Sequence, residues 1–189
     1  ASTGAGSGPS GDRLAITGGD DVPPPLSQER VMPIELDLDL PSGLVPLAWM
    51  VGRWAGAGIV GYPTVEEARF GQEVEISHDG RPFLSYTSHT WLLDEQGERL
   101  RPLATESGFW RTSGPAPEGG TGLEVLLAHP TGYVEIYLGR VEGPRVQLST
   151  DLVARTTTAK EYTAASRMYG LVEGDLLWVM DMAAVGQQL

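Results

Sequence analysis

The chain has no cysteine, one lysine among its 13 basic residues, and no apolar run near the roughly 20 residues that span a bilayer. The absence of cysteine excludes disulfides, thiolate nucleophiles, iron–sulfur clusters and cysteine-based zinc sites. The N-terminus also lacks the charged start and apolar stretch of a signal peptide. We therefore expect a soluble cytoplasmic protein.

Acidic side chains dominate the charge. The chain carries 25 acidic and 13 basic residues, for a formal net charge of -12. Such a surface repels phosphate backbones and anionic lipids, which argues against nucleic acid or a membrane as a partner. Hydrophobic residues make up 41% of the 189 positions, enough for one domain with a real core.

Residues 1–40 are predicted to form a disordered acidic N-terminal tail, because a stretch rich in Gly, Ser, Pro and Asp buries too little apolar surface to offset its ordering entropy. Within it, residues 34–40 alternate apolar and acidic side chains and are read as an edge strand or a strap. The folded domain is expected to occupy residues 41–189. A third and weakest functional hypothesis makes the tail an interaction module.

Strand-like segments recur about every ten residues from Val51 onward, separated by Gly- and Pro-containing turns. The predicted strands are 51–60, 68–77, 83–93, 104–112, 123–129, 132–139, 144–149, 151–157, 162–171 and 175–182. This rhythm predicts an all-β, antiparallel up-and-down barrel of about ten strands, because closure hides the sheet edges. A barrel of that size can hold a ligand. Residues 46–50 are expected to form a helical turn that plugs one end.

Alternation within the strands is clear in two places. Leu176, Trp178, Met180 and Met182 form an apolar stripe in the last predicted strand. In another strand, Val134, Ile136 and Leu138 share one face, whereas Tyr133, Glu135 and Tyr137 share the other.

Few side chains suggest chemistry of their own. His78 and His129 stand beside turn signals and are interpreted as exposed turn residues. His89 lies inside a predicted strand, and together with Arg111 and Arg167 it is a candidate for a ligand pocket, where either arginine could hold a carboxylate. No histidine pair has metal-ligand spacing, and no nucleophile elbow or phosphate loop is present, so a bound cofactor is the better source of chemistry.

The most informative stretch contains Gly52, Trp54, Gly56 and Gly58 at alternate positions. In a first barrel strand, glycine allows close strand approach, and a tryptophan can close a barrel end. No helix follows, which excludes a nucleotide-binding loop.

This motif, followed by Gly61-Tyr-Pro-Thr64, resembles the nitrobindin family, whose barrel is like those of fatty-acid-binding proteins and lipocalins. The resemblance runs from about Leu44 to Leu189 and is closest to actinobacterial members, including a mycobacterial one. Other matching segments are His78–Pro82, Thr90–Trp91, Glu106–Gly108 with Arg111, Ala128–Gly132, Ala159–Glu161, Arg167 and Asp181–Gly186.

The resemblance implies one heme b per chain at one end of the barrel, with Thr64 and Lys160 at the positions that match heme contacts. It also implies an axial histidine in a final strand, which is due a few residues after Leu189. We expect the protein to continue past Leu189, and a chain without that histidine to lose heme. His89 stands where the family more often has arginine. A homodimer fits the family as well.

Two functions follow as hypotheses. The first is a heme-binding barrel that isomerises peroxynitrite to nitrate and binds nitric oxide. The alternative is a non-enzymatic carrier of fatty acids or other apolar small molecules.

Overall fold

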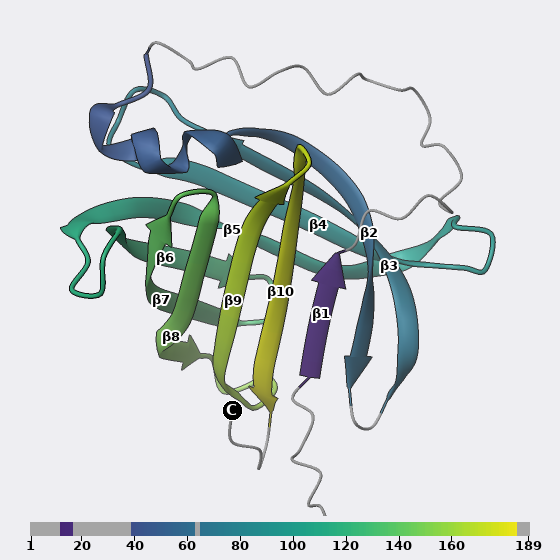
Figure 1. Ribbon diagram of the computed structural model, residues 1–189. Coiled ribbons are helices and arrows are strands. Elements are labelled where there is room, and N and C mark those ends of the chain that lie inside the picture. The colour runs from purple at the N-terminus through teal and green to yellow at the C-terminus, as the bar shows by residue number, and fades with distance from the viewer. Residues whose placement is uncertain (1–11, 17–38, 63–64, 185–189) are drawn as a thin grey trace, which may run out of the picture.

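The computed structural model describes residues 12–16, 39–62 and 65–184, which form a closed antiparallel barrel with a short helix between its first and second strands (Figure 1). The strand order is β1-β10-β9-β8-β7-β6-β5-β4-β3-β2, so every strand from β2 to β10 pairs with its sequence neighbour. The strands are β1 (Asp12–Ile16), β2 (Gly52–Tyr62), β3 (Val65–Ser77), β4 (Leu84–Leu93), β5 (Arg99–Pro115), β6 (Thr121–His129), β7 (Tyr133–Glu142), β8 (Arg145–Arg155), β9 (Tyr162–Val172) and β10 (Asp175–Ala184). The expected barrel of about ten strands is confirmed.

One end of the barrel is closed by η1 (Ser42–Met50), a 3-10 helix that contains the predicted helical turn. Three side chains of this helix, Leu44, Leu47 and Met50, are completely buried, and the helix contacts β5 and β7. Val51 is extended and ends the helix, and the Trp54 indole donates to the Met50 carbonyl at 2.9 Å. Trp54 thus helps to close this end, as the glycine–tryptophan motif predicted.

Strand β1 departs from the expected tail. Its five residues pair antiparallel with both β10 and β2 and complete the barrel. This segment of residues 1–40 is therefore part of the barrel wall rather than a disordered tail. Residues 1–11 and 17–38, including most of the alternating stretch, lie outside the described residues.

Strand β8 corrects a second expectation, since the predicted strands 144–149 and 151–157 are one element. The apparent break is a β-bulge: Ile136 of β7 pairs with Leu152, but the next residue, Tyr137, pairs with Thr150. Asp151 is the extra residue. A bulge of this kind bends a strand without ending it.

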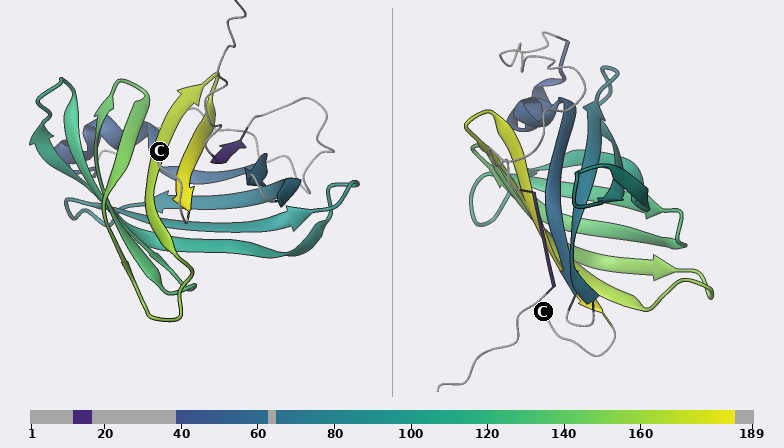
Figure 2. Two further views of the ribbon diagram at one scale, coloured as in Figure 1. Left: turned by 90° about the horizontal axis from the view of Figure 1, so that it is seen from below. Right: turned by 90° about the vertical axis from the view of Figure 1, so that its right-hand side faces the viewer.

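The two ends of the barrel differ. η1 lies across one end, whereas β2 and β10 finish at the other, which has no helix over it among the described residues (Figures 1 and 2). We call the latter the uncapped end. Apolar side chains from five strands pack against the core there but stay only partly buried: Ala68, Leu92, Tyr133, Val153 and Met182.

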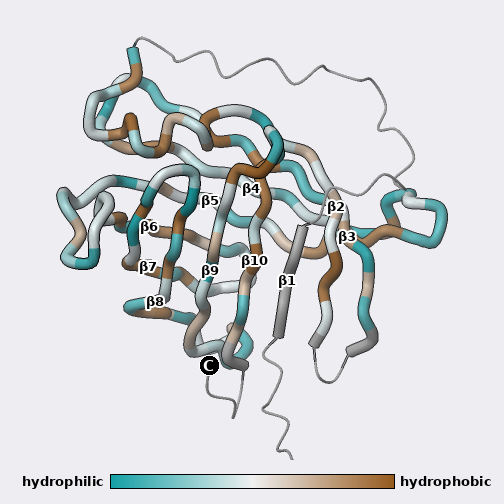
Figure 3. The backbone as a smooth tube through the Cα atoms, viewed as in Figure 1, coloured by the Kyte–Doolittle hydropathy of each residue, from teal (hydrophilic) through white to brown (hydrophobic). Residues whose placement is uncertain are grey.

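The interior is not purely apolar. Apolar and polar residues alternate along the strands (Figure 3). In the apolar stripe of β10, Leu176, Trp178 and Met180 are buried and Met182 is partly buried. On β7, however, Glu135 and Tyr137 point inward while Val134 and Leu138 are exposed. Pairing joins Phe109, Leu126, Ile136 and Leu152 into one apolar row across the outside of β5–β8.

No helix in the described parts of the chain is both long and apolar enough to cross a bilayer.

Candidate functional site

A carboxylate buried in the barrel organises the site. Glu135 of β7 is completely buried and accepts four hydrogen bonds. Its Oε1 accepts from the hydroxyls of Tyr137, at 2.6 Å, and Tyr162. Its Oε2 accepts from His129 Nε2 at 2.7 Å and from Arg167 Nη2 at 3.2 Å. All the acceptor sites of the carboxylate are therefore in use, which is what burial of this charge requires.

Arg167 of β9 extends this cluster across the barrel. Its guanidinium donates to both oxygens of Glu106 on β5, at 2.7 and 3.1 Å, and to the Tyr137 hydroxyl at 2.9 Å. Tyr169 lies 3.5 Å from Nη1. Paired guanidinium–carboxylate bonds of this kind are directional and strong, so β5, β7 and β9 are fixed to one another through their interior faces.

The charges of the cluster stabilise one another. Burial alone would raise the pKa of Glu135, but the hydrogen bond from His129, the Arg167 charge and the two tyrosine hydroxyls outweigh it and lower the pKa from 4.5 to about 2. Burial likewise opposes the charge on Arg167, yet the Glu106 carboxylate raises the pKa of that guanidinium. Burial raises the pKa of Tyr137 and Tyr162, so both phenols keep their protons and act as donors.

His129 does not lie where the sequence analysis placed it. It ends β6 and is 9% exposed, instead of lying in solvent at a turn. Its ring stacks on Tyr133, with 4.1 Å between ring centroids, and burial raises the pKa of that phenol to about 12. The turn signal that follows His129 is real, since Gly132 N donates to the His129 carbonyl. The side chain nevertheless points inward with its strand.

Of the three residues predicted to line a ligand pocket, the structure places one inside the barrel and two outside it. Arg167 points into the barrel and is 3% exposed. His89 is exposed on the outer face of β4, where its ring lies 3.4 Å from the Thr105 hydroxyl. Arg111 is also on the outside and pairs with Glu124 on β6. Strand alternation explains the error: Leu84, Tyr86, Ser88 and Thr90 occupy the inward positions of β4.

Lys160 lies at the uncapped end, in the connection between β8 and β9, and its side chain is exposed. It is the only lysine in the chain. Thr64, the other expected heme contact, lies outside the described residues. The uncapped end thus combines a partly exposed apolar lining with a cation at its edge.

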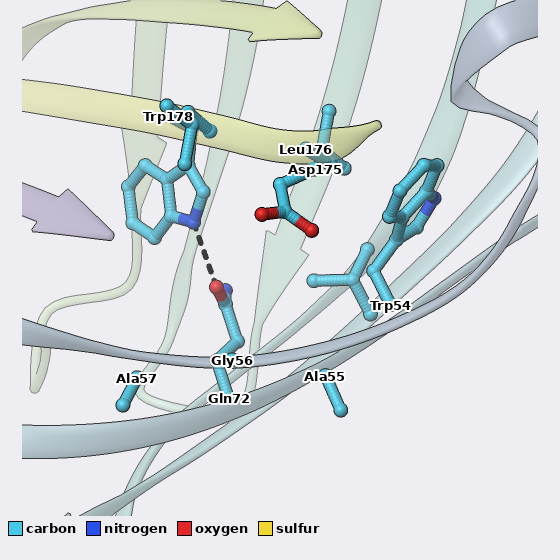
Figure 4. Close-up of a pocket in the computed structure, with 10 residues that line it drawn as sticks. Trp54, Ala55, Gly56, Ala57, Gln72, Asp175, Leu176 and Trp178 are labelled. Atoms are coloured by element: carbon cyan, nitrogen blue, oxygen red, sulfur yellow. Dashed lines mark hydrogen bonds between the residues drawn. The ribbon is translucent and has the colours of Figure 1, made fainter. Parts of the chain in front are cut away.

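A separate small cavity of about 110 Å³ lies where β2 and β10 face each other beyond the short β1 (Figure 4). Trp54, Gly56, Gln72, Leu176 and Trp178 line it, and the Trp178 indole donates to Gln72 at 2.7 Å. Asp175 is the one charged side chain in this lining. The cavity does not include the charged cluster, so it is not the site built by Glu135 and Arg167.

Comparison with known proteins agrees with this architecture. A family model described as the THAP4-like, heme-binding beta-barrel domain matches residues 43–189. This chain belongs to that family. The THAP4-like domain is 55% identical over 168 residues to a ferric nitrobindin-like protein of Kineococcus radiotolerans, covering 84% of this chain and 93% of the relative. It is 45% identical over 188 residues to a peroxynitrite isomerase of Leifsonia xyli subsp. xyli, covering 82% and 93%.

A solved structure gives the same picture. The crystal structure of Rv2717c from M. tuberculosis superposes with a TM-score of 0.66 at 37% identity, covering 79% of this chain and 92% of that one. The nitrobindin resemblance and its actinobacterial leaning are confirmed.

Proposed function

We propose that this THAP4-like domain binds heme b at the uncapped end of its barrel, isomerises peroxynitrite to nitrate with it, and binds nitric oxide there. The observation that carries the proposal is the contrast between the two ends. One end is covered by η1 and filled by its buried apolar side chains. The other end has no helix over it among the described residues, keeps several apolar side chains only partly buried, and carries Lys160 in one of its connections. A large apolar ring that carries acidic groups matches such an end.

The residues present fit this group in two respects. Ala68, Leu92, Val153 and Met182 offer apolar contact and keep water away from a bound ring. The Lys160 ammonium would pair with a propionate in a charge-assisted hydrogen bond, and Thr64 would donate a second one. Bound ferric heme would supply a Lewis-acidic, redox-active iron.

None of the three histidines of this chain stands at the position that the resemblance assigns to the axial ligand. His78 lies in the β3–β4 turn, His89 is on the outer face of the barrel, and His129 uses Nε2 for Glu135.

The carrier alternative gains no support from the interior arginine. Arg167 already donates to two carboxylates and a tyrosine hydroxyl, so its donors are occupied. A fatty-acid carboxylate would have to displace Glu106 or Glu135, and the displaced carboxylate would remain buried without its partner.

A hemin titration followed by absorbance tests the binding. We expect a saturable Soret band from the full-length gene product. Loaded protein should then raise the nitrate yield from peroxynitrite above that of free hemin. The absence of a saturable band would refute the proposal.

Lys160→Met tests the propionate contact. Because exposed ion pairs contribute little, we expect hemin affinity to fall only about two- to fivefold. Arg145→Met is a matched control, since it removes one cation from an exposed residue at the capped end. Equal losses in the two variants would mean that overall charge, rather than a contact by Lys160, sets the affinity.

A further inference from the structure

The connection that carries Lys160 is not held by its own hairpin. β8 and β9 pair only from Arg145 opposite Gly170 to Ser149 opposite Ser166. Beyond this point the Thr150 hydroxyl replaces the backbone pairing: it accepts a hydrogen bond from the Ala165 N–H and donates one to the Ala165 carbonyl. The last residues of β8 then leave β9, and within this hairpin only the exposed ion pair between Arg155 and Glu161, at 3.9 Å, still joins β8 to the connection. Exposed pairs contribute little, so the connection needs another support.

That support comes from the neighbouring β6–β7 hairpin, whose strand β7 pairs with β8 up to Tyr133 opposite Arg155. Thr156 N donates to the Gly132 carbonyl at 2.8 Å, which joins the connection to the β6–β7 turn. Ala159 is buried, and its N–H donates to the Thr156 carbonyl. Gly132 has a φ of +98°, and a Cβ there would lie 2.6 Å from the Thr156 hydroxyl and 3.4 Å from the Ala159 methyl. The turn and the connection are therefore in close contact, with no room for a side chain at Gly132.

The second support is the charged cluster. Tyr162, the first residue of β9 and two residues after Lys160, donates its hydroxyl to Glu135. Glu135 is fixed from the other side by His129, which ends β6 just before the same turn. The β6–β7 turn, through His129, and the β8–β9 connection, through Tyr162, are thus both attached to the buried carboxylate of Glu135.

We propose that Glu135 is a positioning residue: acting through Tyr162, it holds the connection 156–161 on the β6–β7 turn and so fixes Lys160 at the uncapped end for an anionic group of the ligand. This inference rests on the proposed function for the identity of the ligand. The placement of the connection itself does not depend on heme.

The test is a double-mutant cycle on hemin affinity with Lys160→Met, Tyr162→Phe and both together. Tyr162→Phe keeps the buried ring and removes only the hydroxyl that reaches Glu135. Because the Tyr162 hydroxyl is proposed to act through Lys160, we expect Tyr162→Phe to weaken hemin binding by about two- to fivefold, no more than Lys160→Met does. The double variant should be no weaker than Lys160→Met alone. Additive losses would overturn the proposal.

Tyr169→Phe is the matched control. It removes another buried hydroxyl of β9, one that contacts Arg167 but not Glu135 or the connection. It should leave the hemin affinity unchanged, and Lys160→Arg, which keeps the charge, should restore most of the affinity that Lys160→Met loses.

Hydrogen exchange on hemin-free protein gives a readout that does not need the ligand. Tyr162→Phe should speed amide exchange at Thr156 and Ala159, and Tyr169→Phe should not. Unchanged exchange in Tyr162→Phe would refute the positioning even if hemin binds. If the unmutated protein takes no hemin, the proposed function fails, and the exchange rates alone decide whether the cluster holds the connection.

Discussion

Glu135→Gln removes the central charge of the cluster while keeping the size of the side chain. Glu135 is completely buried and accepts four hydrogen bonds, so the variant leaves Arg167 and His129 facing an amide instead of a carboxylate. Its pKa is lowered from 4.5 to about 2 in the folded protein. Because each unit is worth about 1.4 kcal/mol, the folded environment favours the charged form by about 3 kcal/mol.

The direction of the pH dependence follows from that shift. The unfolded state takes up the proton first on acidification, near pH 4.5, whereas the folded state takes it up near pH 2. The stabilisation is therefore complete above pH 4.5 and is lost as the pH falls through 2. We expect Glu135→Gln to lower the free energy of unfolding by about 3 kcal/mol at pH 7, with less than half of this difference remaining near pH 3.

Urea unfolding followed by tryptophan fluorescence measures the difference. A loss of about 3 kcal/mol corresponds to a midpoint shift of about 1.5 M in urea. Other carboxylates titrate in both proteins, so the difference between the two pH profiles isolates Glu135. Glu124→Gln is a control on the neighbouring strand, because its partner Arg111 is exposed and the pair should contribute less than about 1 kcal/mol. Parallel profiles for Glu135→Gln and the unmutated protein would refute the reasoning.

Two further predictions concern the frame around the site. Gly108→Ala would place a Cβ 1.8 Å from the Leu126 carbonyl oxygen, so it should separate β5 from β6 and lower Tm sharply. Gly170→Ala is the control and should change Tm little, because the atom nearest to its Cβ would be 3.8 Å away. Similar Tm values for the two variants would contradict the packing. Leu47→Ala in η1 should cost about 2–5 kcal/mol in urea unfolding, because the side chain is completely buried; a loss below 1 kcal/mol would mean that η1 does not cap the barrel.

The regular spacing of strands and turns was enough to predict the barrel and the helical turn at one end, because alternation marks each short strand and Gly or Pro marks each turn. The bulge at Asp151 could not be separated from a turn, since a bulge also interrupts the alternation. β1 was missed because five residues in a Gly-rich stretch carry little pattern, and their pairing partners lie far along the chain.

The site was harder to predict, because alternation defines two faces of a strand without saying which is inside. On β7 the apolar face of Val134, Ile136 and Leu138 suits a core better than the face of Glu135 and Tyr137, yet the latter is buried. Partners on β6 and β9 make this burial tolerable, and they are distant in sequence. One local signal existed for His129: it shares parity with Leu123, Val125 and Leu127, all buried on β6.

The polar cluster also explains how the uncapped end keeps its shape. The capped end is stabilised by filling, since Leu44, Leu47 and Met50 occupy the space between strands. An end that receives a ligand cannot be stabilised in that way, because filling it would exclude the ligand. Hydrogen bonds and ion pairs fix strands by direction rather than by volume, and a fully satisfied network is rigid. The bonds of Glu135 and Arg167 therefore tie β5, β6, β7 and β9 together and still leave the partly exposed apolar lining available.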